Sequence, residues 1–176
     1  QKITVGPPFY NQVTGPQFAA LVLLMGVAPL LAWRKASARQ LGRQILIPFA
    51  ISLVLVIVLV VVGITSIGAL LGFWISAFVA GTTLLEFYRG TLARMRTNRE
   101  NAFTALGALM ARNRRRYGGY TIHLGVVLIA IGVVGTNFFQ QETQGRLAPG
   151  EQMTVGRYVM VYDSLDQFTL EGNLEV

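Results

Sequence analysis

The sequence contains no cysteine, only one histidine, and few charged residues, which occupy 13% of its 176 positions. The absence of cysteine excludes a disulfide scaffold, thiolate catalysis, a zinc–thiolate site and an iron–sulfur cluster. No phosphate-binding loop, nucleophile triad or catalytic carboxylate pair can be recognised in the sequence. Hydrophobic residues make up 53% of the chain, which excludes disorder because so much apolar surface must be removed from water.

The apolar residues are concentrated in four blocks, and charged segments separate these blocks. About 20 helical residues cross a hydrocarbon core of about 30 Å, and each block reaches or approaches that length. The sequence therefore predicts an all-α polytopic membrane protein with four transmembrane helices. The predicted spans are residues 17–33, 45–64, 69–85 and 117–136, inside a transmembrane region of residues 1–137.

The basic residues are distributed unevenly between the two sides of the predicted spans. Twelve of the 15 lysines and arginines lie in two segments, residues 34–43 and 89–116. The positive-inside rule places both segments in the cytoplasm and both termini outside the plasma (inner) membrane. A net charge of +7 would also suit nucleic acid, but topology and anionic lipid headgroups explain these positions. We expect the lipid membrane, and no nucleic acid, as a partner.

Two further elements are predicted outside the spans. The apolar spacing from Thr91 to Met110 is typical of an amphipathic cytoplasmic helix that lies on the inner membrane surface. It is expected to be a connector, with docking of a partner as the alternative. Residues 138–176 are predicted to start an outer β domain, with one strand over residues 155–163 and a second from Gln167. These strands are too few to bury a sheet face, so the β domain is partial.

His123 is the single histidine, and it lies about 10 Å from the inner end of the fourth span. An ionisable residue at this depth indicates function. An axial ligand to haem iron, a proton relay and an interhelical hydrogen-bond partner all suit it. Gly118, Gly125 and Gly132 recur every seven residues on the same helix, which favours close packing against another helix.

Glu86 closes the third span, three residues before Arg89. An ion pair between these two residues is the expected role of the carboxylate, because residues three apart lie on the same helix face. Proton transfer by Glu86 is the alternative role.

Several long runs resemble one known family: VGPPFYNQVTGP, LLMGVAPLLAWRK and RNRRRYGGYTIHLGVVLIAIGVVGTNF. They are similar to the CcmF family of cytochrome c-type biogenesis proteins, the membrane subunits of bacterial haem lyases, which are related to CcmC and CcsA. The later run ETQGRLAPGEQMTVGRYVMVY resembles the start of that family's outer domain. The resemblance implies a role in attaching haem, received from a haem chaperone, to apocytochrome c. It also implies an intramembrane b-type haem (haem b), with His123 as one axial ligand of the haem iron and quinol as the electron source.

The chain departs from the family pattern in two ways. It has no second histidine, and Trp33 and Trp74 are isolated, so the tryptophan-rich haem-attachment motif is missing. We therefore expect a fragment or a split-gene half, which also suits a start at Gln1, with the remaining part of the haem lyase in another segment. Two alternatives stay open: a non-catalytic membrane scaffold or transporter half in which His123 only bridges helices, and a quinol-oxidising cytochrome b-like subunit.

Overall fold

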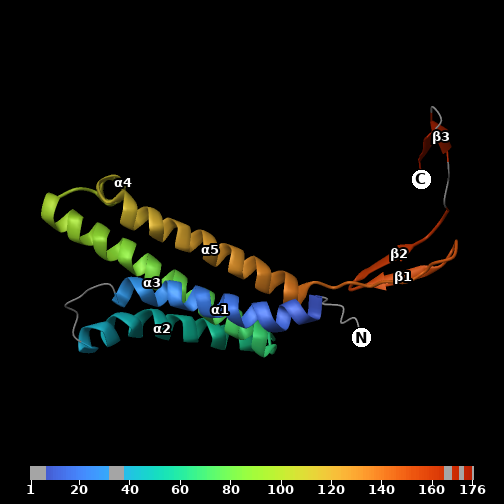
Figure 1. The fold of residues 1–176 in the computed structure, drawn as a ribbon, viewed down its shortest axis with the longest axis horizontal. Helices are drawn as coiled ribbons and strands as arrows, with labels where there is room; N and C mark the ends of the chain where they lie inside the picture. Colours follow the sequence, from blue (N-terminus) through green and yellow to red (C-terminus); the bar gives the residue numbers. More distant parts are fainter. Residues whose placement is uncertain (1–6, 32–37, 165–167, 171–172, 176) are drawn as a thin grey trace, which may run out of the picture. The chain divides into compact units, whose positions relative to one another are not determined.

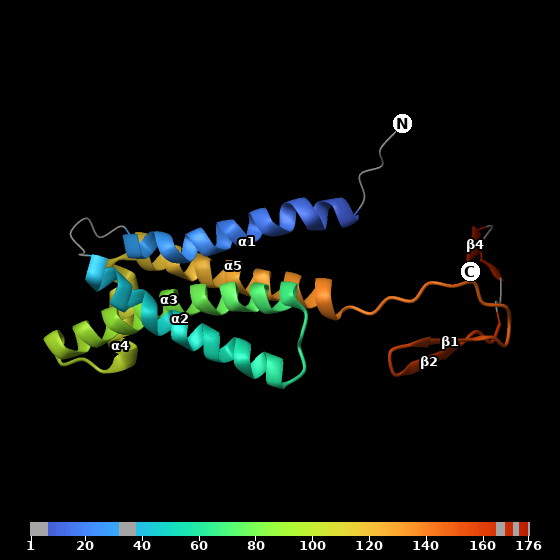
Figure 2. The same ribbon diagram turned by 90° about the horizontal axis from the view of Figure 1, so that it is seen from below.

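The computed structural model describes residues 7–31, 38–164, 168–170 and 173–175, and the chain divides into two compact units, residues 1–138 and 139–176. The helices belong to the first unit, where they run alongside one another (Figures 1 and 2). In the part that the structure describes, they are α1 (Pro7–Leu31), α2 (Ala38–Val61), α3 (Ile67–Asn98), α4 (Ala102–Arg112) and α5 (Arg114–Phe139).

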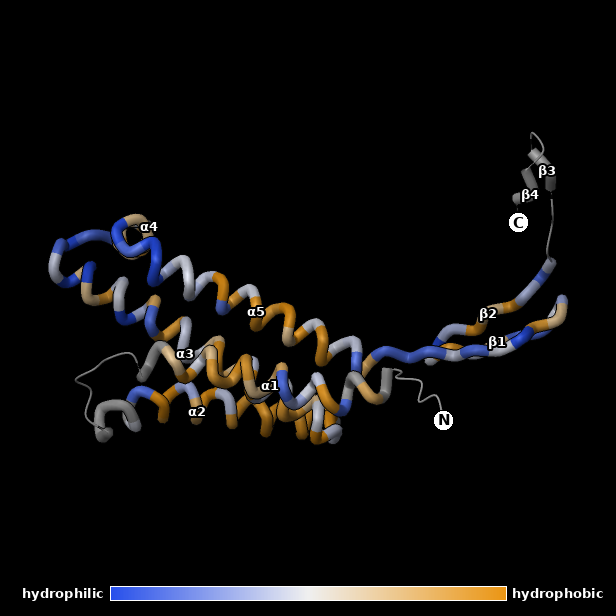
Figure 3. Tube along the Cα trace, in the orientation of Figure 1, coloured by the Kyte–Doolittle hydropathy of each residue, from blue (hydrophilic) through white to orange (hydrophobic). Residues whose placement is uncertain are grey.

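Three of these helices are long and apolar enough to cross a membrane: Gln44–Val61 of α2, all of α3, and all of α5. Their apolar stretches stand out along the traces in Figure 3, while the turns around α4 are hydrophilic. The chain is therefore a multi-pass membrane protein. Of the four predicted spans, the first corresponds to α1, whose described apolar stretch, Gln12–Ala28, is only 17 residues long. Trp33, at the predicted end of that span, lies outside the described residues.

Helix α3 is the centre of the first unit, because α1, α2 and α4 all pack against it. The core combines Val22 of α1 with Phe78 and Val79 of α3 and Val127 of α5. The α1–α3 crossing is close because Gly26 has no side chain. A β-carbon at Gly26 would lie 2.6 Å from Cγ2 and 3.2 Å from Cα of Val79.

Helix α2 meets α3 through a proline and an aromatic group. Pro48 lies inside α2 and is fully buried, and a β-carbon at Gly81 of α3 would lie 3.3 Å from its Cβ. The Trp74 ring is edge-on to Phe49 and stacked on Phe78, with centroid separations of 5.9 and 6.3 Å. Trp74 therefore has a packing role between α2 and α3.

The prediction of one amphipathic helix from Thr91 to Met110 is wrong about its boundaries. Helix α3 continues through the first part of this segment to Asn98, and α4 begins as a separate helix at Ala102. Arg99 adopts a left-handed conformation with φ 53°, which ends α3, and the Asn101 side chain accepts a hydrogen bond of 2.8 Å from the Thr104 amide. The surface location predicted for this segment stays a prediction.

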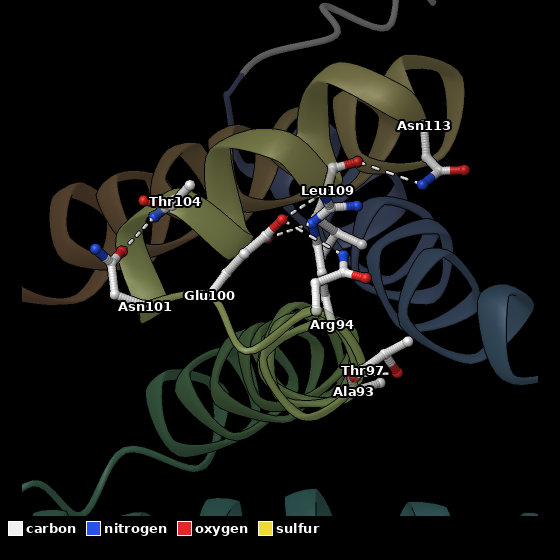
Figure 4. A network of polar contacts seen from close by, with 9 residues as sticks. Ala93, Arg94, Thr97, Glu100, Asn101, Thr104, Leu109 and Asn113 are labelled. Carbon is white, nitrogen blue, oxygen red and sulfur yellow. Dashed lines mark hydrogen bonds and ion pairs between the residues drawn. The ribbon is translucent and has the colours of Figure 1, made fainter.

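The turn between α3 and α4 is also held by an ion pair (Figure 4). Arg94 donates two hydrogen bonds to the Glu100 carboxylate, of 2.8 Å from Nε and 2.9 Å from Nη2. Such a bidentate pair fixes the planes of both groups, so it holds the end of α3 against the start of α4.

The second unit contains short antiparallel strand pairs. Strand β1 (Gln152–Val155) pairs with β2 (Tyr158–Val161), and β3 (Phe168–Leu170) pairs with β4 (Asn173–Glu175). The predicted continuous strand over residues 155–163 is wrong, because Gly156, with φ 59°, and Arg157 form a turn inside it. All four residues of β2 are exposed, whereas Met153 and Val155 of β1 are partly buried, so one face of the hairpin is only partly covered within the described residues.

Candidate functional site

His123 lies on the inward face of α5. Residues three before, four after and seven after it share its face of the helix. These residues are Tyr120, Val127 and Ala130, and all three are buried, with 6%, 3% and 6% of their surface exposed. The imidazole is therefore directed towards the helix bundle, and it is partly buried there.

The Nδ1 atom of His123 is buried and has no hydrogen-bond partner among the described residues. A buried polar atom without a partner costs about 1–3 kcal/mol, so native structures provide nearly all such atoms with a protein partner, a water molecule or an ion. An imidazole with a nitrogen free to bind can ligate a metal ion or carry a proton. Within the described residues, no hydrogen bond from another helix or from α5 itself satisfies Nδ1 of His123.

Gly118, Gly125 and Gly132 lie on the other side of α5 from His123, with Gly125 about 160° away around the axis. A β-carbon at Gly118, Gly125 or Gly132 would meet no atom within 4 Å. The close helix packing predicted for these glycines is therefore absent within the described residues. The bundle contacts α5 through its larger residues instead.

Helices α3 and α5 meet because side chains of α5 fill the space beside glycines of α3. A β-carbon at Gly68, Gly72 or Gly90 would collide, respectively, with the side chains of Phe138, Val134 and Tyr117. These three contacts define an antiparallel register of the two helices. In this register Thr83 of α3 lies at the level of His123. Thr83 is buried, and its hydroxyl donates a hydrogen bond of 2.8 Å to the Val79 carbonyl oxygen of its own helix.

A polar cluster joins α3 to α5 at the end of these helices nearest α4. Glu86 is 13% exposed, and Arg116 Nη2 donates a hydrogen bond of 2.6 Å to its Oε2 atom. Arg116 Nε also donates to the Tyr120 hydroxyl at 3.1 Å, and that hydroxyl donates to Glu86 Oε2 at 3.5 Å. The predicted pair of Glu86 with Arg89 is present, with 3.8 Å between Oε1 and Nη1. We call Glu86, Arg116 and Tyr120 the carboxylate cluster.

Aromatic rings connect the carboxylate cluster to His123. The Phe87 ring packs against Tyr117 and Tyr120, with centroid separations of 5.2 and 6.0 Å. The Tyr120 ring in turn lies 6.1 Å from the imidazole of His123, tilted by 59°. The guanidinium of Arg116 lies over the rings of Tyr117 and Tyr120 as well. Such contacts stabilise a cation beside apolar surface.

The sequence predicts the Glu86–Arg89 pair, which the structure contains, but not the contribution of Arg116 and Tyr120 to it. The role predicted for His123 stays a prediction. A signal for Arg116 was available, because Glu86 ends one predicted span and Arg116 precedes the next, on the same side of the membrane. Residues of opposite charge at the same membrane depth on neighbouring antiparallel helices can form an ion pair. The contribution of Tyr120 depends on the rotation of α5, which the spacing of residues in the sequence does not give.

The chain is similar to bacterial proteins of cytochrome c biogenesis. It is 24% identical over 173 residues to the cytochrome c-type biogenesis protein CcmF of Escherichia coli, and this alignment covers 95% of the chain. It is 28% identical over 163 residues to CcmF of Pseudomonas aeruginosa, covering 92% of the chain. The cytochrome c-type biogenesis protein CycK of Rhizobium meliloti is 26% identical over 165 residues and covers 93% of it. The resemblance inferred from the sequence is thereby confirmed.

The alignments cover 24%, 23% and 24% of these relatives, so the chain spans about a quarter of their length. No family model and no solved structure matches the chain.

Proposed function

We propose that this chain acts in cytochrome c maturation, as part of a membrane haem lyase, and that His123 supplies one axial ligand of an intramembrane b-type haem. The observation that carries the proposal is the buried Nδ1 atom of His123, which lacks a partner among the described residues of a membrane-spanning helix. The similarity of the chain to cytochrome c-type biogenesis proteins supports the same role.

The residues around His123 suit a haem ligand. An apolar setting favours the neutral form of an imidazole, and the neutral form is the one that binds iron. It lies beside buried aromatic and aliphatic side chains, those of Tyr120 and Val127, which suit the apolar faces of a porphyrin. When bound, the haem supplies reversible one-electron transfer. The chain's own contribution is to hold the imidazole in place and to keep water away from it.

For a haem held by two histidines, the second histidine must come from outside these residues, because the 176 positions contain only one histidine. The remaining part of the haem lyase is the proposed source, and it is also the proposed location of the site where haem meets apocytochrome c. A haem chaperone and quinol are further proposed partners. The proposed setting is the inner membrane, with both termini outside, as the distribution of basic residues indicates.

The experiment that tests this proposal is a reduced-minus-oxidised absorption spectrum of the protein, purified in detergent together with the remaining part of the haem lyase. We expect a b-type haem band in the parent and its loss in His123→Ala. Thr121→Ala is the matched control, because Thr121 is a polar residue of the same helix whose hydroxyl already donates to the Tyr117 carbonyl oxygen at 3.0 Å. Added imidazole should restore part of the band in His123→Ala.

Other outcomes separate the alternatives. Equal bands in the parent and His123→Ala, or no band in a folded complex, would refute the ligand role and favour a membrane scaffold. A band that depends on His123, in a protein that does not associate with apocytochrome c or the haem chaperone, would favour a quinol-oxidising cytochrome b-like subunit.

A further inference from the structure

The carboxylate cluster is the strongest polar contact between α3 and α5 in the described part of the chain. Glu86 is almost buried, and one of its oxygens, Oε2, accepts hydrogen bonds from both Arg116 and Tyr120. Hydrogen bonds to charged groups are stronger and more directional than neutral ones. A carboxylate on α3 therefore holds two successive turns of α5 at once.

Tyr120 belongs both to this cluster and to the surroundings of His123. Its side chain is 6% exposed, so its ring cannot leave the interface without losing buried area. It lies three residues before His123, on the same face of α5, and its ring packs beside the imidazole. The hydroxyl of Tyr120 is held by Arg116 and Glu86, so the position of its ring is fixed at both ends.

Rotation of α5 about its axis would move His123 off the bundle face. Successive residues of a helix are about 100° apart around its axis. A rotation of α5 by that angle would therefore bury the adjacent face of the helix and expose the face that is now buried. At the far end of the helix, Phe138 and Val134 oppose this rotation through apolar contacts with Gly68 and Gly72. Near His123, the cluster opposes it through directed hydrogen bonds.

We propose that Glu86, Arg116 and Tyr120 form a positioning site for His123, in which the carboxylate on α3 fixes the rotation of α5 that directs the imidazole into the bundle. This inference rests on the proposed function of His123. The three residues are positioning residues, because they act through the orientation of α5 and do not themselves bind the iron.

The first test compares two ion pairs of the same kind. Glu86→Gln removes the charge that holds α5, and Tyr120→Phe removes only the hydroxyl. Glu100→Gln is the matched control, because Glu100 pairs with Arg94 at 2.8 Å in the turn between α3 and α4, away from His123. In the purified complex we expect a changed midpoint potential and a changed electron paramagnetic resonance signal of the haem in Glu86→Gln and Tyr120→Phe, and neither change in Glu100→Gln. The charge-exchanged double variant, Glu86→Arg with Arg116→Glu, should restore part of the parent signal.

The second test does not need haem, and it uses the absence of native cysteine. A β-carbon at Gly72 would lie 3.5 Å from Cβ of Val134, which is within the range for a disulfide. Gly72→Cys with Val134→Cys should therefore cross-link, and Gly72→Cys with Val133→Cys should not. We expect the preference for position 134 to fall about tenfold when Glu86→Gln is added, since a hydrogen bond to a charged group contributes about that factor.

The outcomes distinguish this inference from the proposed function. If the parent protein binds no haem, the proposed function is refuted. If the cross-linking preference is also unchanged by Glu86→Gln, the role of the cluster in fixing the rotation of α5 is refuted as well. A parent with haem whose potential and cross-linking preference are unchanged in Glu86→Gln and Tyr120→Phe refutes the positioning site alone. A reduced cross-linking preference with unchanged haem signals assigns the cluster to helix packing, which also overturns the inference.

Discussion

The contact between Gly26 and Val79 gives a sharp test of the packing of α1 on α3. Gly26→Ala introduces a β-carbon that would lie 2.6 Å from Cγ2 and 3.2 Å from the backbone Cα of Val79. A rotamer change of Val79 can relieve the first contact, but only separation of the helices can relieve the second. Gly125→Ala is the control, because a β-carbon there meets no atom within 4 Å.

The magnitude follows from comparing these two variants. Each gains about 1 kcal/mol from the higher helix propensity of alanine, so this gain cancels in the comparison. What remains is the cost of overpacking, which is about 1–3 kcal/mol in a well-packed core. We therefore expect Gly26→Ala to be less stable than Gly125→Ala by that amount.

The assay is reversible unfolding of the purified protein in mixed micelles with increasing denaturing detergent, followed by far-ultraviolet circular dichroism. A free energy of unfolding for Gly26→Ala within about 0.5 kcal/mol of that for Gly125→Ala, which is the usual range for a surface substitution, would refute the close crossing of α1 and α3. A marked loss of stability in Gly125→Ala would instead show that another helix covers the glycine face of α5.

Three further predictions concern the turns, and the same unfolding assay checks them. Asn101→Ala should cost about 1 kcal/mol because it removes the cap of the Thr104 amide, and Asn101→Asp should retain the stability of the parent. Gly63→Ala should cost at least about 1 kcal/mol because Gly63 has φ 104°, which alanine rarely adopts; no loss would contradict that conformation. Arg94→Ala should cost about 1 kcal/mol at low salt and less at high salt, as expected for a partly exposed ion pair with Glu100; a loss that is independent of salt would indicate packing by the Arg94 stem instead.

The membrane-spanning helices α2, α3 and α5 could be predicted from the sequence because charges interrupt the apolar blocks on either side. Their ends could not be predicted in the same way. Hydropathy reports where lipid can surround a helix, whereas the backbone hydrogen bonds of α3 continue past the predicted end at residue 85 to Asn98. The helix stops only where Arg99 turns to positive φ and Asn101 begins the next helix.

The turn of the β1–β2 hairpin has a recognisable signal in the sequence. Gly156 and Arg157 interrupt an apolar run, and a glycine followed by a polar residue between two such runs is typical of a turn. The alternation from Tyr158 to Val161 predicts a strand, but period-two patterning does not by itself show where the chain reverses direction.

The site was predicted in part. The depth of His123 in its span could be read from the distance to the nearest arginine, and this was enough to mark it as a candidate ligand. Its orientation into the bundle depends on which face of α5 meets α3, and that depends on contacts such as Val134 with Gly72. Such contacts join residues far apart in the chain, so no local pattern contains them.

The length of α3 has a mechanical consequence. Its 32 residues make a rod of about 48 Å, which exceeds a hydrocarbon core of about 30 Å. Continuous helix joins Glu86 to the tip near Asn98 over 12 residues, or about 18 Å. A flexible loop would absorb a displacement applied at this tip, whereas a helix transmits axial and torsional movement along its length. A displacement of the α3–α4 turn would therefore be transmitted along α3 to Glu86, and through its ion pair with Arg116 to α5, the helix that carries His123.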